Sequence, residues 1–150
     1  MPTSSRFAVA VHVLTALSAN PEQPIKSEQM AKSASTNPAV IRRIASMLSK
    51  AGLTGAQLGL GGGAVLARPA SEITLLDVFR AVEEPRLFSW HRNCPDQECF
   101  IGRNIQKVLR RTTDRAQAAL EAELQKVTIA EVTREVGAPA TCEAMAEQSG

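Results

Sequence analysis

Residues 27–68 constrain the fold of this chain more than any other part. They contain two short helical patterns with a sharp break between them. Asn37 and Pro38 mark the start of the second helix, because asparagine caps helix N-termini and proline fits the first turn. Gly52 suits the left-handed position that follows many helices. The apolar face of this helix, with spacings of three and four, comprises Val40, Ile41, Ile44, Met47 and Leu48. The pattern predicts a helix-turn-helix.

The first helix of the pair is expected over residues 28–34, with Ser27 as its N-cap. A β-hairpin is expected after the second helix, with strands at residues 53–57 and 64–68. Glycine is frequent at its tip, where positive φ angles and close backbone approaches are possible. These glycines are Gly59, Gly61, Gly62 and Gly63. A helix-turn-helix followed by such a hairpin, or wing, is a winged helix.

Basic charge is concentrated in this part of the chain. Between Lys26 and Arg68 there are six lysines or arginines against one acid, Glu28, whereas the whole chain has a net charge of +2. Local positive charge is expected of a surface that neutralises DNA phosphates. In a helix-turn-helix the N-terminal part of the second helix faces the major groove. The predicted DNA contacts are Ser27, Ser35, Thr36, Asn37, Ala39, Arg42, Arg43, Gly61, Gly62 and Gly63.

The composition argues against several other classes of protein. A length of 150 residues with 44% hydrophobic residues suits one domain with its own core. Aromatic residues make up only 3% of the chain, which disfavours a stacking platform for single-stranded nucleic acid. Three cysteines are too few, and odd in number, for a secreted disulfide scaffold, so a reducing cytoplasm is expected. No apolar run approaches the roughly 20 residues that span a bilayer.

Two further features bear on the class of protein. Residues 5–18 mimic a signal peptide, but their apolar residues recur at helical spacing, which favours a first core helix. His12 lies within that helix and is expected to be structural. The chain shows no set of serine, histidine and aspartate, no paired carboxylates and no phosphate-binding loop that would indicate catalysis. We therefore expect no enzymatic activity.

The C-terminal half predicts one long helix. Thr74 and Asp77 form a capping box for a helix that ends near Val82. After an irregular segment, residues 101–127 show a helical pattern about 40 Å long. A small core cannot cover that length, so a second subunit is expected to pack on it. The expected dimer contacts are Ile101, Ile105, Val108, Thr112, Ala116 and Ala119.

The expected domain organisation follows from these elements. Residues 1–82 form the winged helix, residues 83–100 a cysteine-containing sensor loop, and residues 101–136 the dimerisation helices, the last of them capped at Thr128. Residues 137–150 lack periodicity and are expected to be disordered. The expected fold class is mainly α, a winged helix-turn-helix with a small β-hairpin wing and a long C-terminal dimerisation helix.

The sensor loop contains Cys94 and Cys99, and three interpretations of them remain open. In the first they form a redox switch, because they are close enough in sequence for a disulfide. Arg92 and Arg103 would then favour the reactive thiolates. In the second, both are ordinary loop residues. Neither of these interpretations requires a cofactor.

The third interpretation is an iron–sulfur or other metal-bound redox sensor, with His91, Cys94 and Cys99 as ligands. Iron–sulfur clusters take four ligands as a rule, and Cys142 is distant in the sequence, so this is the weaker alternative. Phe88 and Trp90 are expected to fix the loop to the core.

The segments STNPAVIRRIASMLSKAGL, GGG and LARPASEITLLDVFRAVEE resemble the Rrf-two (Rrf2) family of bacterial winged helix-turn-helix transcription regulators. The resemblance extends from about Ser4 to Val136. It implies a sequence-specific, homodimeric DNA-binding regulator, most simply a repressor, on a near-palindromic operator in the cytoplasm. A winged helix used only for protein contacts is a further alternative, and it predicts that Arg42 and Arg43 can be replaced without loss of function.

The resemblance also implies a subgroup. CFIGRNIQKVL, with LFSWH upstream, resembles the branch that lacks the iron–sulfur cluster and keeps one cysteine at the position of Cys99. The wing departs from the family pattern. Leu58 and Ala64 stand where members often carry an arginine before the glycines and an aromatic residue after them. The arginine that could enter a minor groove is therefore missing.

Overall fold

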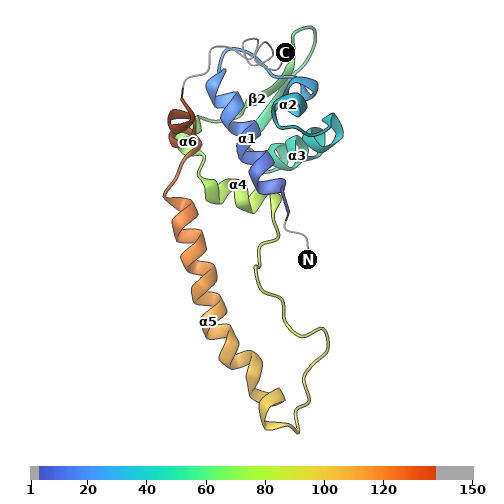
Figure 1. Cartoon of the computed structure of the whole chain (residues 1–150), viewed down its shortest axis with the longest axis vertical. Helices are drawn as coiled ribbons and strands as arrows, with labels where there is room; N and C mark the ends of the chain where they lie inside the picture. Colours follow the sequence, from blue (N-terminus) through green and yellow to red (C-terminus); the bar gives the residue numbers. More distant parts are fainter. Residues whose placement is uncertain (1–3, 138–150) are drawn as a thin grey trace.

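Helices and one small antiparallel sheet make up residues 4–137, the part of the chain that this computed structural model describes. The helices are α1 (Arg6–Ala19), α2 (Ser27–Ser33), α3 (Pro38–Lys50), α4 (Leu75–Val82), α5 (Phe100–Gln125) and α6 (Ile129–Val136), with a short 3-10 turn at Ala70–Glu72. The strands are β1 (Thr54–Gln57) and β2 (Gly63–Leu66). Figure 1 shows a helical body that carries the sheet at one end and α5 at the other. The expected fold class is confirmed. The expected disorder of the tail and the position of Cys142 lie outside the described residues.

Both ends of α3 are formed by the local signals expected from the sequence. The Asn37 side chain accepts a hydrogen bond from the Val40 N–H at 3.0 Å, so Asn37 caps the helix. Beyond the last turn Gly52 has a φ of 75°, and the Leu53 N–H donates to the Leu48 carbonyl at 2.9 Å. Gly52 and the Leu53–Leu48 hydrogen bond form a Schellman motif, in which a left-handed glycine ends the helix and turns the chain. The chain therefore leaves α3 directly into β1.

The start of α2 differs from the expectation. Lys26 is the N-cap and Ser27 is the first helical residue. A lysine side chain has no acceptor, so capping comes from Gln29, whose carbonyl accepts from the Lys26 N–H at 3.1 Å. The Ser27 side chain makes no hydrogen bond to the described residues, because its hydroxyl is not needed for the cap. It therefore remains available at the surface.

The wing is fastened to the body at its base. β2 begins at Gly63 and ends at Leu66, earlier at both ends than the strand expected over 64–68. Ile25 and Ala64 exchange two backbone hydrogen bonds, of 3.1 and 2.9 Å. A Cβ atom at Gly63 would lie 2.6 Å from the Ile25 carbonyl oxygen, which is too close for any side chain. Gly63 is therefore part of the packing between the wing and the segment before α2.

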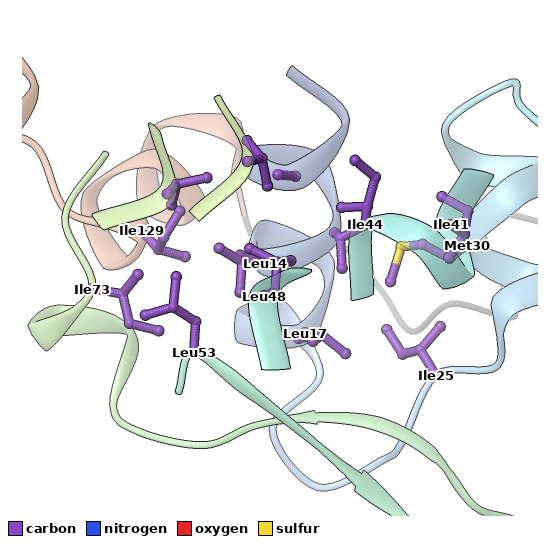
Figure 2. Packing of buried hydrophobic residues seen from close by; sticks show 14 of the residues in the cluster. Leu14, Leu17, Ile25, Met30, Ile41, Ile44, Leu48, Leu53, Ile73 and Ile129 are labelled. Atoms are coloured by element: carbon purple, nitrogen blue, oxygen red, sulfur yellow. The ribbon is translucent and has the colours of Figure 1, made fainter. Parts of the chain in front are cut away.

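One core joins α1, the helix-turn-helix and the C-terminal part of the chain. Figure 2 shows the buried side chains facing one another across these elements. Those labelled there are Leu14, Leu17, Ile25, Met30, Ile41, Ile44, Leu48, Leu53, Ile73 and Ile129. His12 lies at the edge of this core, with Nε2 2.8 Å from the Ser33 hydroxyl, and so links α1 to α2 as a structural residue.

α6 belongs to this body. Ile129 is fully buried, and its N–H donates to the Ile73 carbonyl at 2.8 Å. The Leu75 N–H donates to the Val127 carbonyl at 2.9 Å. The sequence pattern grouped α6 with the dimerisation helix, whereas the structure packs it against α1. This packing depends on a contact between residues far apart in the sequence, because Ile73 and Ile129 meet only once the chain has returned along α5.

α5 extends away from the body, and the segment between α4 and α5 runs to its far end (Figure 1). A helix of its 26 residues is about 39 Å long, and none of them is buried. The segment is fixed to α5, since Gln117 Nε2 donates to the Pro85 carbonyl at 3.0 Å. The Arg110 guanidinium lies 5.3 Å from the centre of the Trp90 ring. Trp90 thus contacts α5, and Phe88 is 45% exposed, so the expected attachment to the core is wrong.

Candidate nucleic-acid interface

The outer face of α3 presents the side chains that the sequence assigned to DNA. Ile41, Ile44 and Leu48 point into the core, so the residues between them face solvent. The exposed positions of this face and of its N-terminus are Asn37, Ala39, Arg42, Arg43, Ser46 and Ser49. The N-terminal half of a second helix is the part that a helix-turn-helix presents to the major groove. α3 therefore has the exposure that a recognition helix requires.

The two arginines of α3 differ in their surroundings. Arg42 Nη2 lies 2.9 Å from Glu28 Oε1 on α2, and both side chains are well exposed. Exposed ion pairs contribute little to stability, so Arg42 can exchange its carboxylate for a DNA phosphate or base at low cost. Arg43 makes no ion pair with a described residue and is also exposed. Both guanidinium groups are thus accessible to DNA, and Arg43 is the less constrained of the two.

A shallow cavity of about 370 Å³ separates α3 from the wing. Its lining brings together Ser27, Arg42 and Gly63, three residues that the sequence predicted to lie at the interface. Ser46, Ser49 and Gln57 also line the cavity and were missed. Ser46 and Ser49 follow Arg42 by four and seven residues, so helical periodicity could have identified them. The cavity joins the helix and the wing into one continuous face, with Arg42, Ser46 and Gln57 among the polar residues on it.

The remaining predicted contacts lie at the turn and at the wing tip. Ser35 is exposed and has a φ of 52°, because it takes the left-handed position that ends α2. The Thr36 N–H donates a hydrogen bond to the Ala31 carbonyl at 2.9 Å, so this N–H is not free to contact DNA. Gly61 has a φ of 75° and open space around it. A Cβ atom at Gly62 would overlap the Gln57 carbonyl oxygen, so this glycine is required by the hairpin itself.

The cysteines lie far from this face, at the start of α5. Both thiols are free and exposed, and Cys99 is the N-cap of the helix. Hydrogen bonds from the backbone N–H of Gly102 and then of Ile101 lower the pKa of the Cys99 thiol below its ordinary value. Backbone N–H groups at the N-terminus of α5 thus favour the thiolate. The arginines that the sequence suggested do not account for it. Cys94 Sγ lies 3.5 Å from Gln97 Nε2.

The residues of this loop do not fit a metal cluster. Within residues 4–137 no three histidine, cysteine, aspartate or glutamate side chains gather as ligands of one metal ion would. His91 Nδ1 lies instead 3.5 Å from Gln106 Nε2, a contact at the limit of a hydrogen bond. Two cysteines fall short of the four ligands that iron–sulfur clusters take. His91, Cys94 and Cys99 are therefore not assembled as a ligand set.

The fold and the polar face of α3 define the class of this protein, a winged-helix DNA-binding regulator. In the described residues no helix is both long and apolar enough to span a membrane. A family model for Rrf2, described as iron-dependent transcriptional regulators, matches residues 3–135. The chain belongs to the Rrf2 family, and it is a DNA-binding transcriptional regulator rather than an enzyme.

Individual relatives agree with this assignment. YwnA of Bacillus subtilis (strain 168), named as an HTH-type transcriptional regulator, is 38% identical over 130 residues, which are 86% of this chain and 95% of YwnA. A solved structure of a protein described as DNA-binding has 36% identity and a TM-score of 0.69, covering 85% of this chain and 98% of that one. The structure of a transcriptional regulator from Lactobacillus plantarum has 26% identity and a TM-score of 0.75, covering 97% and 99%.

Proposed function

We propose that this regulator acts as a homodimer joined through α5. The supporting observation is an apolar row on α5 that no described residue covers. Phe100 and Ile101 are 74% and 67% exposed, and Val108 is 51% exposed. The small residues Thr112, Ala116 and Ala119 continue the row towards the body, and all three are exposed. Apolar surfaces of this length are seldom left in water, and a second α5 is their natural partner.

A dimer of this kind would place two α3 helices on one side of a duplex. Two-fold symmetry calls for a near-palindromic operator with half-sites about 34 Å apart, one turn of DNA. Repression is the simplest output, because a dimer seated on a promoter excludes the polymerase without any further contact. We place the protein in the cytoplasm, because bacterial DNA is there.

The first test concerns the α3 face. A duplex selected from a random pool by the wild-type protein serves as the probe, and fluorescence anisotropy measures affinity at a stated salt concentration. Arg43→Ala is expected to weaken binding by about tenfold to a hundredfold, since a lost arginine contact to a base is worth about 1–3 kcal/mol. Arg42→Ala is expected to have a slightly smaller effect, because the small free energy of the Arg42–Glu28 ion pair offsets part of its contact with DNA.

Arg134→Ala, on the exposed end of α6, is the matched control and should bind like the wild type. If the double variant Arg42→Ala, Arg43→Ala kept the wild-type affinity, the assignment of α3 as the reading helix would be wrong. The same duplex placed across a promoter in an in vitro transcription assay then distinguishes repression from activation.

We further propose that Cys99 and Cys94 make the regulator responsive to hydroperoxides. The Cys99 thiolate attacks one peroxide oxygen, the O–O bond breaks, and the product alcohol or water leaves with a sulfenic acid formed on Cys99. The Cys94 thiol then displaces water from that sulfenic acid to form a disulfide. The support is the position of Cys99 at the N-terminus of α5, where a thiolate is favoured. A disulfide at this position would change the conformation at the start of α5, the proposed dimer helix.

The lowered pKa of Cys99 predicts how its alkylation depends on pH. Since only the thiolate reacts, Cys99 should be modified by iodoacetamide faster than Cys94 near neutral pH. Because the pKa of Cys99 is lowered, its rate should level off at a lower pH than the rate of free cysteine. Mass spectrometry of the two peptides, over a range of about pH 6 to pH 9, gives both rates. Cys94→Ser should leave the Cys99 profile unchanged, and equal rates for both thiols at neutral pH would contradict the assignment.

A further inference from the structure

The tip of the wing exposes two leucines. Leu58 is 90% exposed and Leu60 is completely exposed. The Gly62 N–H donates to the Gly59 carbonyl at 3.1 Å, and Gly61 between them has a φ of 75°. These values describe a type II turn, in which glycine takes the third position and the residue before it stands at the corner. Leu60 is therefore held outward on a formed turn.

The wing carries no charge with which to bind phosphate. Residues 54–67 contain neither lysine nor arginine, and neither aspartate nor glutamate. The next cation, Arg68, lies at the base of the wing with Nη2 3.2 Å from Asp77 Oδ2. Hydrogen bonds from this hairpin to DNA phosphates are thus left to backbone N–H groups and to the exposed Gln57 side chain. The two large side chains at its tip, Leu58 and Leu60, are instead apolar, and residues 54–67 hold no acidic group that would repel a polyanion.

The tip continues the face formed by α3 and the wing. The cavity between them is lined by Arg42 and Ser46 from α3 and by Gln57, the residue directly before Leu58. In Figure 1 the hairpin loop projects from the body beyond the sheet. With glycine at 59 and 61–63 the loop has little side-chain bulk apart from the leucines. A slim, neutral tip beside a DNA-reading helix can enter a groove that is too narrow for a helix.

We propose that the wing of this regulator reads the minor groove with an apolar wedge, in which Leu60 leads and Leu58 supports it. Leucine side chains that enter a minor groove partly unstack a base step and bend the duplex. Pyrimidine–purine steps such as TA open most easily, so the wedge would select such steps at the operator flanks without reading base edges. This inference rests on the proposed placement of α3 in the adjacent major groove.

The test compares two Leu60 variants with the wild type on the selected duplex. Leu60→Ala is expected to weaken binding about tenfold, as removal of one buried leucine side chain predicts, with an unchanged salt dependence. 2-Aminopurine placed at the flanking steps should brighten on binding of the wild type, when its base unstacks, and stay quenched with Leu60→Ala. Leu60→Arg should steepen the slope of log K against log salt by about 0.9 through one added phosphate contact. Val136→Ala, an exposed apolar residue on α6, is the control.

The outcomes separate this inference from the proposed function. Leu60→Ala with wild-type affinity and wild-type 2-aminopurine signal, while Arg43→Ala fails to bind, would overturn the wedge and leave the role of α3 intact. Failure of the wild type to bind any duplex would overturn both. Unchanged DNA affinity with weaker self-association of Leu58→Ala, Leu60→Ala would show that a second copy covers the tip, which also overturns the wedge.

Discussion

Replacing Val108 by glutamate is expected to convert the proposed dimer into a monomer. Val108 lies in the middle of the exposed apolar row of α5 and is 51% exposed in the single chain. In the proposed dimer the introduced carboxylate would be buried in an apolar interface, where an unpaired charge is costly. The affinity for a duplex with two half-sites should fall by about a hundredfold or more, because the advantage of bivalent binding is lost.

The experiment has a matched control on the same helix. Ala118 is exposed and lies off the apolar row, so Ala118→Glu introduces the same charge into the same helix without entering the interface. Light scattering coupled to gel filtration measures the mass of both variants, and circular dichroism checks that α5 is still helical. A Val108→Glu variant that remained dimeric would show that the subunits meet elsewhere.

Substitution of Gly63 by alanine is expected to cause a large loss of stability at the base of the wing. The added Cβ would lie 2.6 Å from the Ile25 carbonyl oxygen, which belongs to the backbone and cannot turn away. To relieve the overlap, β2 must move off the segment before α2 and lose the two Ile25–Ala64 hydrogen bonds. We expect a loss of about 3 kcal/mol in the free energy of unfolding and a melting temperature lower by roughly 10 °C.

Gly61→Asn provides the comparison for this substitution. Gly61 also has an unusual backbone, with a φ of 75°, but no atom lies within 4 Å of a Cβ placed there. Asparagine tolerates the left-handed region, so this change should alter stability by only about 0.5 kcal/mol. Thermal melting of both variants measures the difference. Equal melting temperatures for Gly63→Ala and the wild type would show that the wing base is not anchored at Ile25 in solution.

The local elements of this protein were predictable because their signals act over a few residues. Asn37 caps α3, and Gly52 ends it, as the sequence suggested. Thr74 and Asp77 cap α4 through reciprocal hydrogen bonds of 3.0 and 3.1 Å. Each of these arrangements depends on groups no more than four or five positions apart, so its chemistry can be read along the chain. The cap of α2 was misassigned because Ser27 and Gln29 compete for the same helix end.

The candidate site was only partly predictable. The sequence located the α3 face by periodicity and charge, and the exposure of Arg42 and Arg43 agrees with it. The pairing of Arg42 with Glu28 was not foreseen, because it joins two helices across the turn. Gly61, Gly62 and Gly63 at the tip of the wing appeared equivalent in sequence. In the structure Gly61 has a positive φ with open space around it, whereas close backbone contacts leave no room for a side chain at Gly62 and Gly63.

The sequence by itself determined the helix-turn-helix, the hairpin, the long α5 and the family, because periodicity, capping residues and short motifs are written within each segment. Only the tertiary structure decided that α6 packs on α1 and that Gly63 supports the wing at Ile25. It also decided that the backbone at the start of α5 favours the Cys99 thiolate. These features join residues brought together by folding or depend on where a helix begins in space, and no local pattern specifies such contacts.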